Sequence, residues 1–415
     1  MSVTAPAPAA TPVGLRPLHV RLALVALATG GFAIGTTEFV TMGLLPDIAS
    51  GIGQSIPTTG HLITAYAFGV VVGAPVIVAL AARFPKRALA IGLILALGLG
   101  NAVTALADGY GQVMVARFIA GLPHGAYFGT ASLIAASLVE PHLRGRAVAF
   151  VMTGLSVATV AGVPASAWLG QHLGWRSAYW AVLGVTILTA ALILAFVPST
   201  PGDRAATVRG ELSALKRPQV LYATAAGMVG FGGLFAMYSF IAPVVTDVTD
   251  LSRSAIPGFL LAFGVGSVLG TVLAGRLGDW DVVRTVVGGF IATMVVLLLF
   301  ALLSPYVVTA VAGVFLIGVL GGVLSLNLTL RLMGAAGDAR MLGAALNHSA
   351  LNVANGLGAW LGSVVIAAGL GYRAPSLVGA ALAVAGLTVF LLGLAADRRR
   401  TARIDHAPEL VDCAR

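Results

Sequence analysis

Charged residues are scarce in this sequence of 415 residues: Asp, Glu, Lys and Arg together make up 9% of it, against 58% hydrophobic residues. Soluble domains carry about 25% charged residues. The 24 Lys and Arg and the 15 Asp and Glu are too few to cover a soluble protein of this length. The scarcity therefore argues against a soluble enzyme, a disordered chain or a fibrous protein, and it predicts a protein that crosses a membrane several times.

Cysteine is nearly absent as well. The single Cys413 excludes an internal disulfide and a cysteine-based metal site. The sequence also has no Gly-x-x-x-x-Gly-Lys-Ser/Thr loop and no cluster of His, Cys or acidic residues at metal-ligand spacing. We therefore expect no ATP site, no metal, no cofactor and no catalytic residue. A membrane-embedded enzyme would need clustered polar groups near an interface, which the sequence lacks.

Long apolar blocks are abundant. Strands of outer-membrane barrels alternate in hydrophobicity, whereas here the blocks are continuous and the mean hydropathy is +0.98. A bilayer core needs about 20 apolar residues per helix, so the sequence predicts an all-α membrane protein with twelve spans. The expected spans are 20–45, 58–82, 88–106, 110–138, 145–170, 176–197, 219–245, 255–275, 283–303, 305–332, 340–368 and 374–396.

Basic residues are distributed very unevenly over the loops. Twenty lie on the side of the N-terminus: Arg16, Arg21, Arg83, Lys86, Arg87, Arg144, Arg146, Arg204, Arg209, Lys216, Arg217, Arg276, Arg284, Arg331, Arg340, Arg398, Arg399, Arg400, Arg403 and Arg415. The other side carries only Arg176, Arg253 and Arg373. By the positive-inside rule both termini are cytoplasmic. This distribution also explains the formal net charge of +9 without a nucleic-acid partner.

The two halves of the sequence resemble each other. Residues 67–70 recur at 262–265, 167–170 recur at 359–362, and the Gly-Trp-Arg of 174–176 recurs as Gly-Tyr-Arg at 371–373. An offset that spans six helices gives both halves the same orientation, which is a parallel repeat. The expected organisation is a cytoplasmic tail (1–19), a six-helix bundle (20–197), a cytoplasmic linker (198–218), a second six-helix bundle (219–396) and a cytoplasmic tail (397–415).

Small residues recur at every fourth position of several spans. Spacing of four places them on one helix face, where they allow helices to approach closely. The stripes are Ala65, Gly69 and Gly73; Gly154, Ala158, Gly162, Ser166 and Gly170; Ala262, Gly266, Gly270, Ala274 and Gly278; and Ala350, Ala354, Gly358 and Gly362. We interpret these four spans as the helices where the halves meet, although Gly and Ala are common enough here to form such stripes by chance.

At the level of motifs the chain resembles the major facilitator superfamily, and the resemblance covers nearly all of it. In the first span, 35–39 and 42–47 resemble the proton-driven drug exporters, especially the chloramphenicol-resistance and arabinose-efflux type permeases. Arg117 and Gly121 match the R-x-x-x-G element of the antiporters. The fifth-span antiporter motif matches at Gly154, Gly162, Pro164 and Gly170, although Val163 separates its usual Gly-Pro pair.

The resemblance implies a loop gate on the cytoplasmic side. After the eighth span, Gly275 and Asp279 match the family's G-x-L-x-D loop, with Arg284 following. After the second span, Arg83, Lys86 and Arg87 keep the basic part of that loop. Ala82 and Pro85 stand where the family has Asp and Gly, a departure that weakens an ion-pair gate in the first half.

Two charged residues, Glu38 and Arg117, lie deep within the expected spans. A charge near the bilayer centre costs about 2.5–3.5 kcal/mol on insertion scales, so both are candidates for function. A carboxyl group whose surroundings alternate can bind a proton on one side and release it on the other. Glu38 is therefore the predicted proton carrier, the alternative being a structural carboxylate held by nearby threonines. Arg117 stays charged and would bias that equilibrium, or instead hold backbone carbonyls at a helix contact.

Other polar residues in the spans are candidate cavity residues. His124 and His348 suit a proton relay or a cavity lining. Asn347, Asn352 and Asn355 line a cavity or bond neighbouring helices, and Tyr127 and Tyr238 could contact an apolar ligand, as could Tyr66, Phe128 and Phe235. Asp47 is expected to be a solvated residue at the mouth.

Taken together, these features predict a proton-coupled secondary transporter that exports a small organic molecule, such as a drug, sugar or nucleoside, by alternating access. It would act as a monomer in the cell membrane, with small-molecule substrate, protons and lipid as its partners. The first alternative is an uptake symporter or facilitator for sugars or other small solutes with the same fold. A membrane enzyme and a non-transporting sensor are weaker alternatives, because catalytic clusters and signalling domains are both missing.

Overall fold

The computed structural model describes residues 17–81, 84–199, 217–336 and 340–405, with side chains at 74–75, 78–81, 340–345 and 398–405 excluded. Within these ranges the chain is helical and has no strand, so the predicted fold class is confirmed. The first part of the chain forms α1 (Pro17–Gly43), α2 (Leu45–Gly51), α3 (Ile56–Ala81), α4 (Lys86–Leu106), α5 (Tyr110–Gly121), α6 (Pro123–Ser137), η1 (Pro141–Leu143), α7 (Arg144–Val157), η2 (Ala158–Gly162), α8 (Val163–Leu173) and α9 (Trp175–Phe196).

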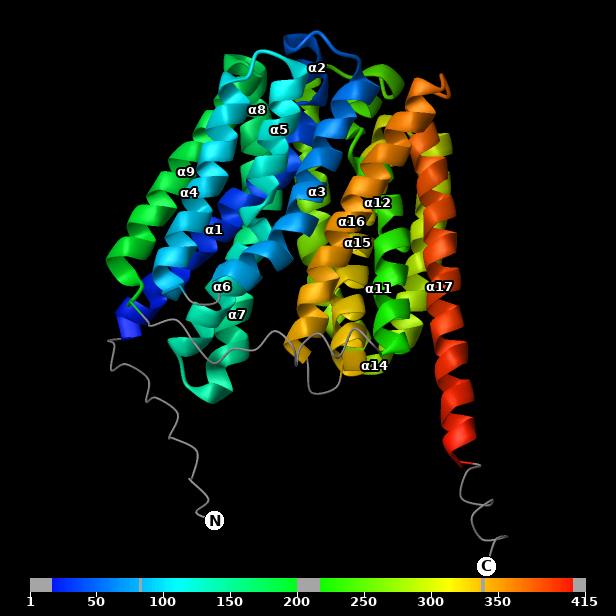
Figure 1. Ribbon diagram of the computed structural model, residues 1–415. Coiled ribbons are helices and arrows are strands. Elements are labelled where there is room, and N and C mark those ends of the chain that lie inside the picture. Colours follow the sequence, from blue (N-terminus) through cyan, green and yellow to red (C-terminus); the bar gives the residue numbers. More distant parts are fainter. Residues whose placement is uncertain (1–16, 82–83, 200–216, 337–339, 406–415) are drawn as a thin grey trace, which may run out of the picture.

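The second part continues in the same style. It forms α11 (Pro218–Gly230), α12 (Gly232–Tyr238), α13 (Ile241–Pro243), η4 (Val244–Val248), η5 (Arg253–Ala255), α14 (Ile256–Leu303), α15 (Val307–Ala336), α16 (Arg340–Ala367) and α17 (Ala374–Asp405). Figure 1 shows these helices side by side, with the start of α1 and the end of α17 at one end of the bundle and α2 at the opposite one. We call these the termini end and the far end.

Ten helices of the described residues are long and apolar enough to cross a membrane. The count is consistent with twelve crossings. The short helices α5 and α6 together form one further crossing, and the long helix α14 contains two crossings instead of one. The consecutive helices α5 and α6 meet at Pro123, whose ring cannot donate a backbone hydrogen bond. Helix α14 runs for 48 residues but has an extended residue, Asp281, in its interior. The Asp281 carboxylate accepts a hydrogen bond from the backbone N–H of Arg284 at 3.0 Å, which caps a new helix there.

Close glycine contacts repeat between the two parts of the chain. Gly121 of α5 packs directly on the backbone of Tyr66 in α3, and Gly318 of α15 packs in the same way on Phe263 in α14. Both members of the second pair stand 197 positions after those of the first. A side chain at either glycine would collide with the facing backbone. Equivalent helices are therefore packed by equivalent residues, as a parallel repeat requires.

The four helices with small-residue stripes do form the contact between the halves, as predicted, because α3 packs on α16 and α14 packs on η2 and α8. The stripes themselves, however, lie on other faces of these helices. In α7 and α8, Gly154, Gly162 and Gly170 pack on α1, within the first part of the chain. Gly266 and Gly270 pack on α15, within the second part. Gly69 and Gly73 likewise pack on 118–122, and Gly358 and Gly362 on α12. Small residues permit close approach wherever backbones cross, and here they tighten each bundle internally.

The two parts of the chain meet along other faces of the same helices. Gly264 of α14 packs on the backbone of Thr159 in η2, and the Thr64 hydroxyl of α3 donates to the carbonyl oxygen of Gly356 in α16 at 3.3 Å. Near the far end, Gly43 packs against Leu260. One buried apolar cluster includes residues of both parts, among them Met42 and Phe240. We call this contact region the seam.

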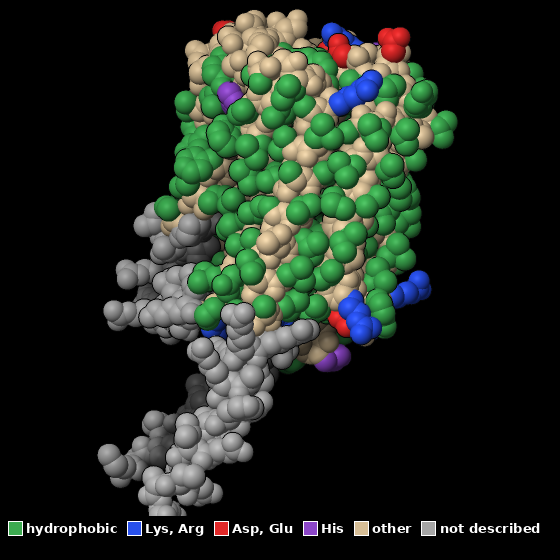
Figure 2. Space-filling view, turned by 90° about the vertical axis from the view of Figure 1, so that its right-hand side faces the viewer, with side chains coloured by type: hydrophobic (Ala, Val, Ile, Leu, Met, Phe, Trp, Pro, Cys, Tyr) green, Lys and Arg blue, Asp and Glu red, His purple; other side chains and the backbone are tan. Residues whose placement is uncertain are grey.

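The outer surface of the bundle is apolar. Figure 2 shows hydrophobic side chains over most of the height of one face, with charged side chains gathered near its two ends. Large side chains such as Val308 and Leu392 are 80% and 56% exposed. In water so much exposed apolar surface would cause aggregation, but lipid tails satisfy it. The surface is that of a multi-pass membrane protein.

The predicted linker and tails lie mostly outside the described residues, as does Arg83. The domain boundaries at 19–20, 197–198, 218–219 and 396–397 therefore stay a prediction.

Candidate functional site

A cavity of about 180 Å³ lies at the seam. Its lining includes Glu38, Phe39, His124, Ser156 and Thr159 from the first part, and Phe235, Tyr238, Phe263, His348 and Asn352 from the second. Phe39 stacks on Phe235 with ring centroids 6.4 Å apart, so aromatic rings from both parts meet at its wall. A pocket with aromatic walls and a few polar groups is suited to a small organic ligand.

Glu38 is the acidic residue of this cavity lining. It lies in α1 and is 7% exposed. One carboxylate oxygen, Oε1, accepts a hydrogen bond from the side-chain amide of Asn355 in α16 at 3.3 Å. None of the ion pairs within the described residues includes Glu38. The carboxyl group is thus buried against a neutral partner that belongs to the other part of the chain.

Arg117 of α5 is fully buried, and its side chain bonds the backbone of α1. Its Nη2 donates to the carbonyl oxygen of Thr37 at 3.0 Å. The guanidinium carbon lies 4.4 Å from the ring centre of Tyr66 and 5.6 Å from that of Tyr179, distances at which aromatic faces stabilise a cation. The Nε and Nη1 atoms have no hydrogen-bond partner. Arg117 and Glu38 form no ion pair within 4.0 Å, although Arg117 bonds the residue next to Glu38 in α1.

The two predicted histidines lie at the cavity and are joined by a phenylalanine. The Nδ1 atom of His124 is 3.0 Å from the hydroxyl oxygen of Tyr66. The ring of His124 is 5.5 Å from that of Phe128, which stacks on His348 at 5.9 Å. Through Phe128 the seam thus has a His–Phe–His contact across it, and Tyr66 links this contact to Arg117.

The predicted asparagines and tyrosines have different positions. Asn352 and Tyr238 line the cavity, and Asn355 bonds Glu38 beside it. Asn347 does not line it: its amide nitrogen donates to Thr329 at 2.7 Å and to the carbonyl of Ser325 at 3.2 Å, which ties α16 to α15. Tyr127 does not line the cavity either. Its hydroxyl donates to the carbonyl oxygen of Leu27 in α1 at 3.0 Å.

The predicted loop-gate residues are not joined to one another across the seam in the part of the chain that the structure describes. Arg87 donates to the carbonyl oxygen of Leu194 in α9. Arg284 pairs with Asp281 of its own loop at 3.4 Å. Gly275 faces open space, because a side chain added at this position would contact no other described residue. Lys86 and Asp279 have no described hydrogen bond or ion pair, and Pro164 follows the π-helical turn η2 at the start of α8.

At the far end an ion pair that was not predicted from the sequence crosses the seam. The Asp47 carboxylate of α2 lies 3.0 Å from the guanidinium of Arg253 in η5. Gln171 of α8 donates to the carbonyl oxygen of Arg253, also at 3.0 Å. The side chain of Asp47 is only 16% exposed, and its second oxygen, Oδ2, is buried without a partner. Asp47 is therefore not the solvated residue that was expected.

This ion pair predicts an unequal response to its two single substitutions. Burial raises the pKa of Asp47 above its usual range, and Arg253 offsets only part of that effect. The neutral form of Asp47 thus favours the closed far end. Closure therefore weakens as pH rises through the raised pKa of Asp47. Arg253→Gln removes the offsetting charge, so it should open the far end about fivefold at neutral pH, the equivalent of about 1 kcal/mol. Asp47→Asn should keep it closed.

The measurement is the distance between spin labels at Gln54 and Tyr306, two exposed far-end positions in opposite parts of the chain, in a Cys413→Ser background. A matched control is Arg176→Gln, since Arg176 pairs with Asp108 of its own part at 3.6 Å. Equal opening by Asp47→Asn and Arg253→Gln would contradict the assignment.

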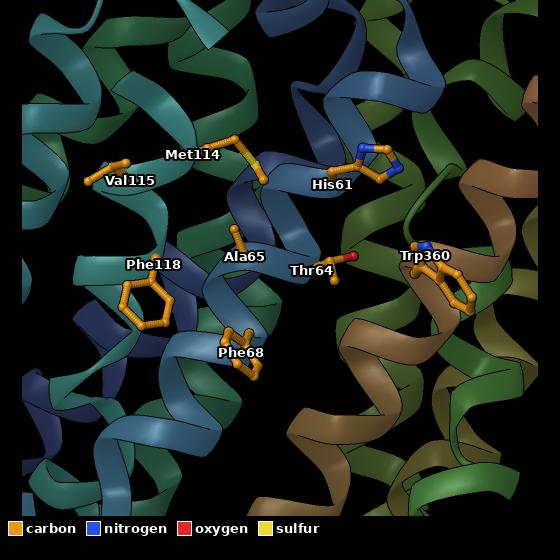
Figure 3. A pocket seen from close by; sticks show the side chains of 8 residues that line it. All are labelled: His61, Thr64, Ala65, Phe68, Met114, Val115, Phe118 and Trp360. Carbon is orange, nitrogen blue, oxygen red and sulfur yellow. The ribbon is translucent and has the colours of Figure 1, made fainter. Parts of the chain in front are cut away.

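A second pocket, of about 540 Å³, lies on the outer surface of α3, α5 and α16 (Figure 3). It is lined by His61, Thr64, Ala65, Phe68, Met114, Val115, Phe118 and Trp360. Phe68 and Trp360 are 60% and 48% exposed, which for a membrane protein means that they face lipid. It contains none of the predicted site residues.

Several residues around Arg117 were not predicted from the sequence. Tyr179 of α9 faces its guanidinium and bonds the Thr41 hydroxyl at 2.9 Å. Asn101 of α4 is fully buried and donates to the hydroxyl of Thr37 at 3.2 Å. A lone asparagine within an apolar span was a usable signal for Asn101. Tyr179 gave none, because a tyrosine near the end of a span is typical of any membrane helix.

Comparisons with known proteins agree on one family. A family model described as the Major Facilitator Superfamily matches residues 27–337. The chain is 37% identical over 382 residues to the inner membrane transport protein YdhP of Escherichia coli (strain K12), covering 92% of this chain and 98% of that protein. It is 36% identical over 391 residues to the chloramphenicol resistance protein of Streptomyces lividans, covering 93% and 98%.

More distant proteins are similar as well, and the solved structures among them share the fold. The putative transporter AraJ of Escherichia coli (strain K12) is 31% identical over 379 residues, which is 89% of this chain and 94% of that protein. Among solved structures, the human organic anion transporter MFSD10 (TETRAN) has a TM-score of 0.66 at 16% identity, covering 91% of this chain and all of that one. A bacterial homologue of the human lysosomal transporter Spinster, in an inward-facing and unoccupied conformation, has a TM-score of 0.65 at 15% identity, covering 92% and 96%.

Proposed function

The chain belongs to the major facilitator superfamily, and on that premise we propose that it is a proton-coupled exporter of a small organic molecule. It is a multi-pass membrane transporter. In the proposed orientation both termini are cytoplasmic and the far end faces outward. Two six-helix bundles, 20–197 and 219–396, rock against each other at the seam and expose the cavity to one side at a time. No partner other than substrate, protons and lipid is needed for this cycle.

The observation that carries the proposal is the position of Glu38. Its carboxyl group lies at the wall of the cavity between the two parts of the chain. An ionised carboxylate is costly in such a buried place unless a cation is close. Rocking changes what surrounds Glu38, so it can change whether the proton is held. Arg117 binds the adjacent residue of α1, and a nearby cation stabilises a carboxylate.

The cavity supports a neutral, partly aromatic substrate. Phe39, Phe235 and Tyr238 offer ring faces, and Asn352 and Ser156 offer hydrogen-bonding groups. One carboxyl group is a weak anchor for a strongly cationic ligand. A relative is named for chloramphenicol resistance, and chloramphenicol has the neutral, aromatic and hydroxylated character that this lining would accept.

The remaining site residues have proposed roles as well. His124 and His348 line the path by which protons and substrate reach Glu38. Gly154, Gly162, Pro164 and Gly170 set the packing of the fifth span on the first. We propose that Arg83, Lys86, Arg87, Gly275, Asp279 and Arg284 form the gate at the termini end.

The direction of coupling is the test. In inverted membrane vesicles that contain the chain, an acidic lumen should drive radiolabelled chloramphenicol inward, because antiport moves substrate against the proton flow. Collapsing the pH gradient with nigericin should stop accumulation, and vesicles without the protein are the control. Movement of chloramphenicol out of the lumen together with protons would instead indicate a symporter.

A further inference from the structure

The contact between Glu38 and Asn355 crosses the seam in the buried interior. Glu38 belongs to α1 and Asn355 to α16, and the two side chains are 7% and 0% exposed. Within the described residues, the other side-chain to side-chain hydrogen bond between the two parts is the pair of Asp47 and Arg253 at the far end. Glu38 and Asn355 therefore form a buried polar connection between the halves at the cavity.

The hydrogen bonding of Asn355 is incomplete. Its Nδ2 donates to Glu38, but its Oδ1 is buried and has no partner. An asparagine amide offers donors on nitrogen and an acceptor on oxygen. An ionised carboxylate can only accept, so it can never satisfy the amide oxygen. A protonated carboxyl group has an O–H donor, and it can bond both atoms of the amide at once.

The two protonation states of Glu38 thus differ in how well they fit this contact. With the proton on Glu38, an acid–amide pair has two hydrogen bonds and no net charge. Without the proton, one bond remains, the amide oxygen stays unsatisfied, and a charge is buried. A bond to a charged carboxylate is stronger than a neutral one, but that gain is smaller than the cost of burying an unpaired charge.

We propose that Asn355 is the positioning residue through which the second half of the protein responds to the protonation of Glu38. This deepens the proposed function and rests on it. When Glu38 carries a proton, its pair with Asn355 holds α1 to α16 and keeps the far end closed. When the proton leaves, the carboxylate loses its fit to Asn355 and is drawn toward the free N–H groups of Arg117, and the seam is released.

The surroundings of Glu38 contain other titratable or charged side chains. They are Tyr66 of α3, Arg117 of α5, His124 of α6, Tyr179 of α9, Tyr238 of α12 and His348 of α16. None of the hydrogen bonds found in the described residues joins any of these side chains to Glu38, whereas Asn355 bonds it directly. The test therefore changes Asn355 alone and leaves all of these groups in place.

The experiment measures closure of the far end in the full-length chain in nanodiscs, with spin labels at Gln54 and Tyr306. All variants carry Asp47→Asn and Cys413→Ser, so that the carboxyl group at the far end no longer contributes to the pH response. In the otherwise unaltered chain the short-distance population should grow as pH falls. Asn355→Leu has a similar volume and no polar atoms, so it should lower the ratio of closed to open protein at low pH about tenfold. Asn355→Gln, which keeps the amide, should restore much of the response. Glu38→Gln should stay closed at every pH.

Two controls protect the interpretation. Asn327→Leu removes a fully buried asparagine that bonds the carbonyls of Ala274 and Val323 within the second part, so it should keep the pH response. Should Asn355→Leu fail to give monodisperse protein, Asn355→Ala serves the same purpose, because its side chain has no polar atom that could pair with Glu38.

The outcomes separate this inference from the proposed function. An unchanged pH response in Asn355→Leu, together with loss of coupled export in Glu38→Gln, would overturn the role of Asn355 and leave the proton-carrier role of Glu38 standing. Normal coupled export by Glu38→Gln would overturn both. Loss of the pH response in Asn355→Leu, with recovery in Asn355→Gln, is the result that supports the inference.

Discussion

Replacing Glu38 by glutamine is expected to reduce pH-gradient-driven export to the level of vesicles that lack the protein. The substitution keeps the shape of the side chain and its ability to accept a hydrogen bond from Asn355. It removes the exchangeable proton, so a proton gradient has nothing to act on at this site. Substrate affinity should change by less than about tenfold, because at most one hydrogen bond to the ligand is altered.

Transport and binding are measured separately to test this. Export is followed in inverted vesicles with an acidic lumen, and binding by tryptophan fluorescence or calorimetry on purified protein with chloramphenicol. Glu140→Gln is the matched control, because Glu140 lies on the surface, with a side chain 67% exposed, and contacts only His142 among described ion pairs. Gradient-driven export at the normal rate by Glu38→Gln would rule out Glu38 as the proton carrier.

Replacing Arg117 by methionine is expected to abolish gradient-driven export without lowering the thermal stability of the protein. Arg117 is fully buried, yet its Nε and Nη1 atoms have no hydrogen-bond partner and no carboxylate lies within ion-pair distance. A buried charge that is only partly compensated does not stabilise a fold, and an apolar side chain of similar volume is often neutral or stabilising in its place. The residue is thus costly to the fold, and its proposed effect on Glu38 would account for its presence.

Loss of the positive charge should disfavour the ionised form of Glu38, so that the proton is not released on the cytoplasmic side. The melting temperature in detergent and the rate of export report the two effects independently. Arg117→Lys is the companion variant. It keeps a charge but cannot hold the Thr37 carbonyl and lie flat on Tyr66 in the same way. We therefore expect its export rate to lie between that of the unaltered protein and that of Arg117→Met. A large fall in melting temperature for Arg117→Met would favour a purely structural role.

Much of the site was predictable because charge is rare inside a membrane. Glu38 and Arg117 stand out in the sequence for that reason, and the structure places both beside the cavity region. Polar uncharged residues gave a weaker signal. Asn347 and Tyr127 find partners on neighbouring helices, since an amide or hydroxyl in an apolar span is equally able to line a cavity or to bond a helix.

Spacing within one helix also has limits as a signal. The stripes of small residues correctly indicate close helix contacts, but the contacts lie inside each bundle rather than between the two. A stripe specifies that a face is approached closely and contains no information about which helix approaches it. The local sequence around Asp47 likewise does not identify its partner, because Arg253 is 206 positions away.

The sequence alone determined that this protein is an all-helical membrane protein with an internal repeat. Hydropathy, glycine content and loop charge are local properties, and each segment's interaction with the bilayer depends on them directly. Only the tertiary structure decided which polar residues meet: that Glu38 faces Asn355 and not Arg117, that two histidines contact one phenylalanine, and that an ion pair crosses the seam at the far end. These contacts depend on the registration of helices from opposite halves of the chain. That registration is set by packing over the whole seam, and no single segment of sequence specifies it.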